Sequence, residues 1–190
     1  MDEMNRRFEL IELPLSGLFM IRRKRMGDNR GYLERLFCAH ELAEAGWTDP
    51  IAQINQTHTD RKGTIRGMHF QHPPHAEKKL VMCLKGGVFD VAIDIRKDSP
   101  TFLKWHGEIL SPEISIALLI PEGFAHGFQT LTPDVEMLYC HSAFYAPGRE
   151  AGIHPNDPAI NIIWPNEIME MSDRDKEHPF LDSTFDGVTL

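Results

Sequence analysis

Cysteine is scarce in this 190-residue sequence, where it occurs only as Cys38, Cys83 and Cys140. The three are odd in number and form no C-x-x-C pair, so neither a disulfide framework nor a cysteine-rich metal cluster is expected. Two of them lie inside apolar runs, which is typical of reduced core residues in a cytosolic protein. We therefore expect free thiols and a cytoplasmic location.

Positive charge is also in short supply. Lys and Arg total 20 against 28 Asp and Glu, for a net charge of -8. Broad nucleic-acid binding is not expected, because it requires a basic face. No apolar run approaches the length of a membrane span, and the charged residues 1–10 lack the apolar segment of a signal peptide. We expect neither a nucleic acid nor a membrane as partner.

Short apolar or alternating segments, separated by turn formers such as Gly86-Gly87 and Pro147-Gly148, are abundant. Many short strands with regular turns favour an all-β sandwich or barrel. One helix is predicted at residues 39–46, ending at a glycine, and a short one at residues 172–177. The expected strands cover residues 18–24, 51–58, 64–70, 79–84, 88–95, 105–110, 115–120, 125–131, 135–145 and 160–164. In residues 88–95 strand alternation predicts one apolar face and one face that carries Asp90 and Asp94.

Two histidine motifs are the first candidates for chemistry. In T-I-R-G-M-H-F-Q, residues 64–71, strand alternation puts His69 and Gln71 on one face. P-x-G-x-x-H, residues 121–126, delivers His126 from a turn and resembles the second motif of the cupin barrels. A lone histidine in a strand is more often a hydrogen-bonded structural residue than a catalytic one.

Cupin barrels often hold a metal through histidines of two such motifs, so a metal-dependent enzyme is one alternative. Its donors would be His69, His72 or His75, Glu77 and His126. The usual H-x-H pair is missing, and residues three apart on a strand face opposite ways. The geometry therefore disfavours a metal site.

Three further features each have an ordinary structural interpretation. Lys79 opens an apolar strand, where a lysine commonly discourages edge aggregation. Tyr139 and Tyr145 are evenly spaced on one expected strand, which fits core packing. Ser172 in S-D-R-D, residues 172–175, fits a helix N-cap.

Taken together, these segments resemble the 4-keto-6-deoxy-sugar nucleotide 3,5-epimerases, the family of dTDP-4-dehydrorhamnose 3,5-epimerase. The resemblance runs from residue 28 to residue 175. It rests on D-N-R-G at 28–31, I-R-G-M-H-F-Q at 65–71, K-L-V at 79–81, V-F-D-V-A-I-D-I-R-K-D-S-P-T-F at 88–102, I-P-E-G-F-A-H-G-F at 120–128, the tyrosine pair and S-D-R-D.

The resemblance implies a cupin double-stranded β-helix, a jelly-roll barrel, as one domain over residues 1–190. Its core would span about residues 18–165, with an N-terminal arm and a C-terminal tail packed on it. It also implies a homodimer, a dTDP-linked sugar as substrate, and no metal or other cofactor. The activity implied is epimerisation at C3, C5 or both, through an enolate, in deoxysugar biosynthesis.

The resemblance also assigns roles. It implies that His69 is the general base, Asp175 its partner, Tyr139 the general acid, and Lys79 a neighbour of the keto oxygen. Positions that hold or frame the substrate are matched by Arg30, Gln53, Asn55, Arg66, His126, Tyr145, Glu150 and Arg174.

These residue types suit the chemistry. A neutral imidazole is a suitable base near pH 7, and a carboxylate on its other nitrogen fixes the tautomer. An ammonium stabilises an enolate electrostatically, and inversion requires a proton donor on the opposite face. Arginine forks bind a diphosphate in a bidentate manner.

One segment departs from the family. The family reads D-x-R-G-x-F-x-E, but here Leu33 stands at the Phe position and Arg35 at the Glu position, unless one residue is deleted and Glu34 takes the role. In the family this segment helps to bind the nucleotide, partly across the dimer interface. A second alternative, from another class, is a cupin that binds a sugar nucleotide without catalysis.

Overall fold

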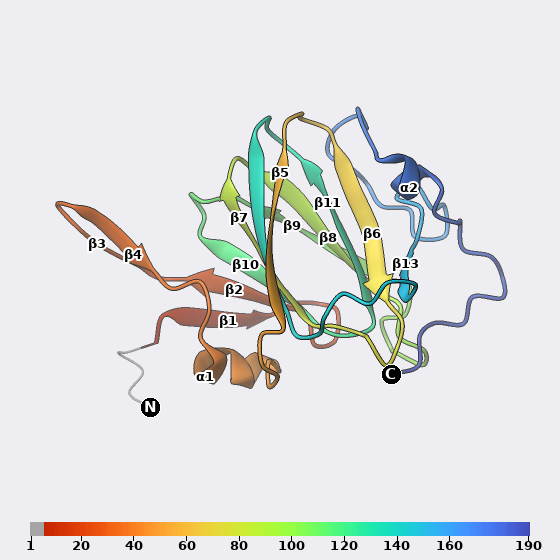
Figure 1. The fold of residues 1–190 in the computed structure, drawn as a ribbon, viewed down its shortest axis with the longest axis horizontal. Helices are drawn as coiled ribbons and strands as arrows, with labels where there is room; N and C mark the ends of the chain where they lie inside the picture. Colours follow the sequence, from red (N-terminus) through yellow and green to blue (C-terminus); the bar gives the residue numbers. More distant parts are fainter. Residues whose placement is uncertain (1–5) are drawn as a thin grey trace.

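The computed structural model describes residues 6–190 and consists mainly of two β-sheets that face one another (Figure 1). The first sheet has six strands in the order β1-β2-β10-β7-β12-β5, and each recorded pairing within it is antiparallel. Its strands are β1 (Phe8–Glu12), β2 (Phe19–Arg23), β5 (Gln53–Thr59), β7 (Lys79–Lys85), β10 (Ile116–Ile120) and β12 (Val135–His141). Because neighbouring strands in this sheet are often far apart in the sequence, the sheet brings sequence motifs from distant parts of the chain together.

The second sheet has five strands in the order β13-β6-β11-β8-β9. Its strands are β6 (Ile65–Gln71), β8 (Val88–Asp94), β9 (Trp105–Leu110), β11 (Phe124–Thr130) and β13 (Glu150–Gly152). The two histidine motifs lie side by side here, because His126 of β11 is the register partner of His69 of β6. The all-β prediction is confirmed.

The remaining elements lie outside the two sheets. β3 (Arg25–Asp28) and β4 (Gly31–Glu34) form a hairpin that projects from one side of the molecule in Figure 1. α1 (Ala39–Leu42) continues into the 3-10 helix η2 (Ala43–Ala45), which ends at Gly46 with a φ of 93°. α2 (Asp173–Lys176) is capped by the Ser172 hydroxyl, which accepts from the Asp175 amide at 3.1 Å. Both predicted helices exist, and both are shorter than predicted.

The main core lies between the sheets. Val81 and Met137 of the six-stranded sheet pack with Ala92 and Phe128 of the five-stranded sheet. Burial of each of the larger side chains among them stabilises the fold by about 1.5–3 kcal/mol. The outer face of each sheet is also covered, by α1 and the residues after it on one side and by C-terminal residues on the other. This wrapping explains why β8 has two buried faces: the outer one packs on the C-terminal residues, and the inner one, between the sheets with Val88 and Ala92, carries the fully buried Asp90.

Two predictions about strands are wrong. Residues 160–164 form no strand, although their alternating Ile160, Ile162 and Trp164 do pack on the outer face of the five-stranded sheet. Asn161 between them has a φ of 54°, which interrupts an extended strand. Tyr145 is not on the strand of Tyr139, because β12 ends at His141. Within residues 6–190 no helix has the length and apolar content needed to cross a membrane.

Candidate active site

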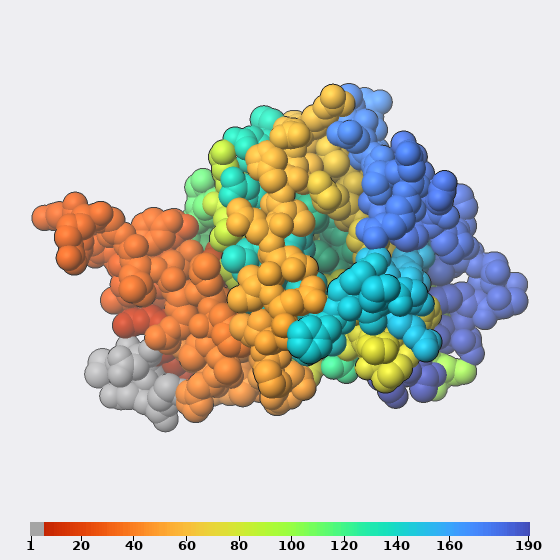
Figure 2. Space-filling model, viewed as in Figure 1, coloured from red at the N-terminus to blue at the C-terminus, as the bar shows by residue number. Residues whose placement is uncertain are grey.

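A pocket of about 780 Å³ opens between the two sheets at one end of the barrel. Strands β5, β6, β7, β11 and β12 contribute its walls, and the segment around α2 folds back over its mouth. In Figure 2 this face of the molecule is hollowed between β5 and the C-terminal segment. His69, Lys79, His126 and Tyr139 all line the pocket.

The centre of the pocket is an imidazole–carboxylate pair. His69 Nε2 lies 2.7 Å from Asp175 Oδ1, across 106 residues of sequence. Burial alone raises the pKa of Asp175, but the hydrogen bonds from His69 and from the Gly67 amide hold the pKa below its usual value. The carboxylate is therefore ionised at neutral pH and accepts from Nε2–H, which leaves the lone pair on Nδ1 free to take a proton.

A salt-bridged frame surrounds this pair. Arg174 donates to Glu150 at 2.8 Å, and its Nη2 lies 3.1 Å from His69 Nε2. The Tyr145 hydroxyl is 3.4 Å from the same Glu150 carboxylate. The tail and the loop after β12 are thus tied together at the pocket mouth.

Tyr139 supplies a buried phenol from the opposite sheet. Its hydroxyl lies 3.3 Å from Thr57 Oγ1, and burial raises the pKa of Tyr139 well above its usual value. The phenol is therefore protonated at neutral pH and can act as an acid. The ring meets His126 edge to face, with centroids 6.2 Å apart.

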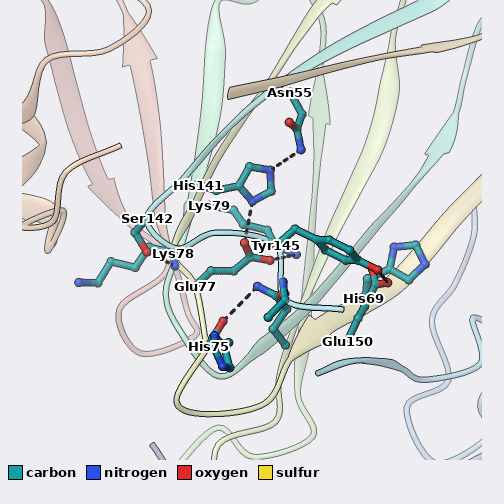
Figure 3. Close-up of polar contacts among 12 residues, drawn as sticks. Asn55, His69, His75, Glu77, Lys78, Lys79, His141, Ser142, Tyr145 and Glu150 are labelled. Atoms are coloured by element: carbon teal, nitrogen blue, oxygen red, sulfur yellow. Dashed lines mark hydrogen bonds and ion pairs between the residues drawn. The ribbon is translucent and has the colours of Figure 1, made fainter. Parts of the chain in front are cut away.

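Lys79 lies in the interior of the six-stranded sheet, between β10 and β12. It is only 8% exposed, so the structural interpretation as an edge lysine is wrong. Its Nζ is 3.2 Å from Glu77 Oε1, and Glu77 Oε2 in turn accepts from His141 Nδ1 at 2.8 Å (Figure 3).

His126 forms a second imidazole–carboxylate pair on the five-stranded sheet. Its Nε2 lies 3.0 Å from each oxygen of Asp90, a residue that is fully buried. The carboxylate fixes the ring so that it faces the pocket.

The other predicted binding residues divide into two groups. Gln53, Asn55 and Arg66 line the pocket; the Gln53 side chain accepts from the Tyr145 amide, and Arg66 Nε donates to Thr59 Oγ1 at 3.0 Å. Arg30 does not line the pocket of its own chain. It lies on the β3–β4 hairpin and is paired only with Asp28 among its recorded contacts.

The segment that departs from the family lies on the same hairpin. Glu34 is paired with Arg23 and Arg25, and Arg35 with Glu41 at 2.6 Å. Leu33 is exposed. Neither Glu34 nor Arg35 reaches the pocket of its own chain.

The donor set of the metal-dependent alternative is not brought together. His72 and His75 lie outside the pocket, and Glu77 is engaged by Lys79 and His141. Within residues 6–190 the one group of potential ligands is His69, Asp175 and His178. The Arg174 guanidinium beside it disfavours a further cation there.

Sequence reasoning overlooked three groups: the buried Asp90 as a partner of His126, and two residues of the pocket lining, Glu77 as a partner of Lys79 and His141. Strand alternation could have found the last two, because Glu77 is two residues before Lys79 and His141 is two residues after Tyr139. Arg66 and His69 are three apart and still share the pocket, because the register of β6 against β11 shifts between His126 and Phe128.

The fold and site together define a barrel with a carboxylate-paired imidazole, a buried phenol and a lysine in one pocket. A family model described as dTDP-4-dehydrorhamnose 3,5-epimerase matches residues 12–183. The dTDP-4-dehydrorhamnose 3,5-epimerase of Shigella flexneri is 42% identical over 167 residues, which covers 87% of this chain and 92% of the relative. The dTDP-4-dehydrorhamnose 3-epimerase of Streptomyces niveus is 35% identical and covers 94% of this chain and 86% of the relative.

A solved structure is also similar. The dTDP-6-deoxy-D-glucose-3,5-epimerase of Legionella pneumophila, in complex with dTDP-4-keto-L-rhamnose, superposes with a TM-score of 0.84 at 40% identity, over 88% of this chain and 89% of that one. The chain belongs to the dTDP-4-dehydrorhamnose 3,5-epimerase family. The predicted cupin fold and isomerase class are thereby confirmed.

Proposed function

We propose that this protein epimerises a dTDP-linked 4-keto-6-deoxy-hexose next to its ketone, converting dTDP-4-dehydro-6-deoxy-glucose to a dTDP-4-dehydro-rhamnose-type product. The observation that carries the proposal is the His69–Asp175 pair, 2.7 Å apart in a pocket that also holds Lys79 and Tyr139. The family relatives named above act on, or bind, dTDP-4-keto sugars.

The first step is removal of a proton. His69 Nδ1 takes the proton from the carbon beside the ketone. The electron pair of the C–H bond forms the C=C bond of an enolate, and the π pair of the C=O bond moves to the keto oxygen. Asp175 stabilises the imidazolium that forms. The Lys79 ammonium stabilises the enolate charge, which matters most in an enclosed pocket of low dielectric.

The second step is return of a proton from the opposite face. Tyr139 comes from the six-stranded sheet and His69 from the five-stranded sheet, so the sugar ring would lie between them. The phenol gives its proton to carbon: the C=C pair of the enolate forms the new C–H bond and the oxygen pair re-forms the C=O bond. The Tyr139 phenolate and the His69 imidazolium that remain return to their starting states by proton exchange with solvent. The base, the acid and the cation all come from the chain, so this route requires no metal or other cofactor.

The remaining pocket residues suit a sugar nucleotide. Arg66 and Arg174 offer guanidinium forks to the diphosphate, while Gln53, Asn55, His126 and Glu150 offer hydrogen bonds to the sugar. Tyr145 is half exposed at the pocket mouth, where a flat aromatic ring can pack on a base or sugar.

We also propose a homodimer in which Arg30 serves the partner's pocket. Met26, Tyr32 and Leu33 on the projecting hairpin expose apolar surface, and Arg30 between them is remote from the pocket of its own chain. Exposed apolar surface of this kind favours a protein interface. The three free cysteines favour a cytoplasmic location, which cell fractionation would test.

Incubation with dTDP-4-keto-6-deoxyglucose in deuterium oxide tests the activity. We expect deuterium to appear at the inverted carbon, read by proton NMR at C3 and C5. Incorporation at both positions indicates a 3,5-epimerase, and incorporation at one indicates a mono-epimerase such as the Streptomyces niveus relative. Binding of the substrate without any exchange would overturn the proposal in favour of a non-catalytic binding protein.

A further inference from the structure

Three polar side chains that meet beside Tyr139 form an unusually buried ionic group. The Glu77 carboxylate uses one oxygen for Lys79 Nζ, at 3.2 Å, and the other for His141 Nδ1, at 2.8 Å. The side chains of Glu77, Lys79 and His141 are only 9%, 10% and 11% exposed. Placing an ion in such surroundings is costly unless it is paired and hydrogen-bonded, so the arrangement requires an explanation.

The strand register brings the three together. His141 is the direct partner of Lys79 across the β7–β12 ladder, and it lies two residues after Tyr139 on the same face. The rings of Tyr139 and His141 are stacked, with centroids 6.1 Å apart and 27° between their planes. In Figure 3 the Glu77 carboxylate lies between the ring of His141 and the end of Lys79.

The contacts also indicate the charge of Glu77. Asn55 Nδ2 is a donor, and it approaches His141 Nε2 at 3.5 Å, so Nδ1 carries the hydrogen that Glu77 accepts. Burial raises the pKa of Glu77, but the hydrogen bond from His141 and the charge of Lys79 outweigh burial and leave the pKa below its usual value. The ionised Glu77 carboxylate thus lies between the Lys79 ammonium and the His141 ring.

We propose that Glu77 is a positioning residue that keeps Lys79 charged and directed into the pocket, and that His141 holds the Glu77 carboxylate in place. The inference rests on the proposed function, in which the ammonium stabilises the enolate. A neutral amine could not supply that stabilisation, so catalysis depends on the carboxylate although Glu77 itself touches no reacting atom.

The neighbouring Lys78 provides an internal comparison. Its Nζ is paired with Asp49 at 2.5 Å, and its side chain points away from the pocket residues in Figure 3. Asp49 does not line the pocket. Glu77→Gln removes the carboxylate partner of Lys79, and Asp49→Asn removes that of the adjacent Lys78. Only the first substitution changes a residue of the pocket lining.

Other ionisable groups lie in or beside the pocket that Lys79 lines, and Glu77→Gln leaves their side chains in place. They are Tyr139 and His141 on β12, His69 on β6, His126 on β11 with Asp90 on β8 behind it, Glu150 on β13, and Arg66, Arg174 and Asp175 elsewhere on the pocket wall. The β10 partner, Ile120, is apolar. Glu77 is the carboxylate at salt-bridge distance from Lys79. We therefore expect the loss of Glu77 to cause most of any change in the titration of Lys79.

The test has two readouts. The first is the dependence of kcat on pH between about 6 and 10, where we expect Glu77→Gln to lower kcat roughly 10- to 100-fold and to move the alkaline limb to lower pH by about one unit or more. KM should change less, because the interaction strengthens in the transition state. Glu77→Asp keeps the charge and should restore much of the profile, and Asp49→Asn should leave it unchanged.

The second readout is independent of activity. In protein labelled at lysine Cε, the Lys79 NMR signal, assigned by its loss in Lys79→Arg, should titrate at lower pH in Glu77→Gln. An unchanged Lys79 titration would overturn the inference. So would a shifted titration with an unchanged kcat profile, because the charge would then not matter for catalysis. If the unmodified protein shows no epimerase activity but the titration shifts, the pairing stands and only the proposed function fails.

Discussion

The ability of His69 to act as a base depends on its hydrogen bond to a single carboxylate, that of Asp175. In Asp175→Asn the amide replaces a carboxylate that fixes the His69 tautomer. We expect turnover to fall by about 10³–10⁴-fold, by analogy with the loss of the oriented histidine in Ser-His-Asp enzymes. The shape of the side chain is kept, so the circular dichroism spectrum should be unchanged. A fully active Asp175→Asn variant would exclude the pair from catalysis.

The two proton-transfer residues should fail in different ways. His69→Ala should abolish both epimerisation and exchange of substrate hydrogens with deuterium oxide, because no enolate forms. Tyr139→Phe keeps the ring and costs little packing, so His69 can still remove and return a proton on its own face. We expect deuterium wash-in to continue in Tyr139→Phe while inversion slows sharply.

NMR of the recovered substrate and product separates these outcomes. If Tyr139→Phe stopped exchange as completely as His69→Ala, the phenol would be needed to form the enolate. If it inverted at the normal rate, another group or a water molecule would be the acid.

At the scale of elements, the close contact of β6 and β11 sets the position of both histidines. A Cβ at Gly127 would lie 2.6 Å from the Arg66 carbonyl oxygen and 2.9 Å from Gly67 Cα. These are backbone atoms, which cannot rotate away. Gly127→Ala should therefore destabilise the protein by about 1–3 kcal/mol and lower kcat by displacing His69. The matched control is Gly87→Ala, where the nearest atom is 3.9 Å away; denaturant melts of both variants would check this, and equal stability would contradict it.

The elements also show what sequence patterns can and cannot predict. Alternation alone predicted that His69 and Gln71 share a face and that Lys79 opens a strand, because the side-chain direction in a strand is local. It could not predict that Asp90 orients His126 or that Arg66 joins His69 in one pocket. Those contacts depend on strand order and on a register shift, which involve residues far apart in sequence. The segment at 160–164 has the right alternation but no pairing strand, so its apolar side chains pack without a ladder.

At the scale of the whole molecule, acid should weaken the fold. Burial raises the pKa of Asp94, but hydrogen bonds from Arg96, Ser99 and Thr101 outweigh it and depress the pKa. Asp175 is depressed as well. A depressed folded-state pKa gives stability that is present above the unfolded value of about 3.9 and is lost as pH falls through the folded value.

Urea melts between about pH 2 and pH 7 would measure this. We expect the free energy of unfolding to be nearly constant with respect to these groups above about pH 5 and to fall steadily below about pH 4. Asp94→Asn should lower stability at pH 7 and flatten the acid slope. An acid slope that Asp94→Asn leaves unchanged would show that Asp94 does not contribute.

The proposed dimer makes a prediction about where Arg30 acts. If Arg30 serves the partner's pocket, a mixed dimer of an Arg30→Ala chain and a His69→Ala chain contains one intact site, since the chain that keeps His69 receives Arg30 from the other. Alone, the Arg30→Ala variant should be weakly active and the His69→Ala variant inactive. Equal mixing with subunit exchange should restore about one quarter of the unmodified activity, because half the dimers are mixed and half their sites intact. If Arg30 served its own pocket, no mixed site would be complete and mixing would restore nothing.

Light scattering establishes the dimer first, and a fully active monomer at micromolar concentration would remove both the dimer and the shared site. The remoteness of Arg30 from the pocket of its own chain is the observation that favours restoration.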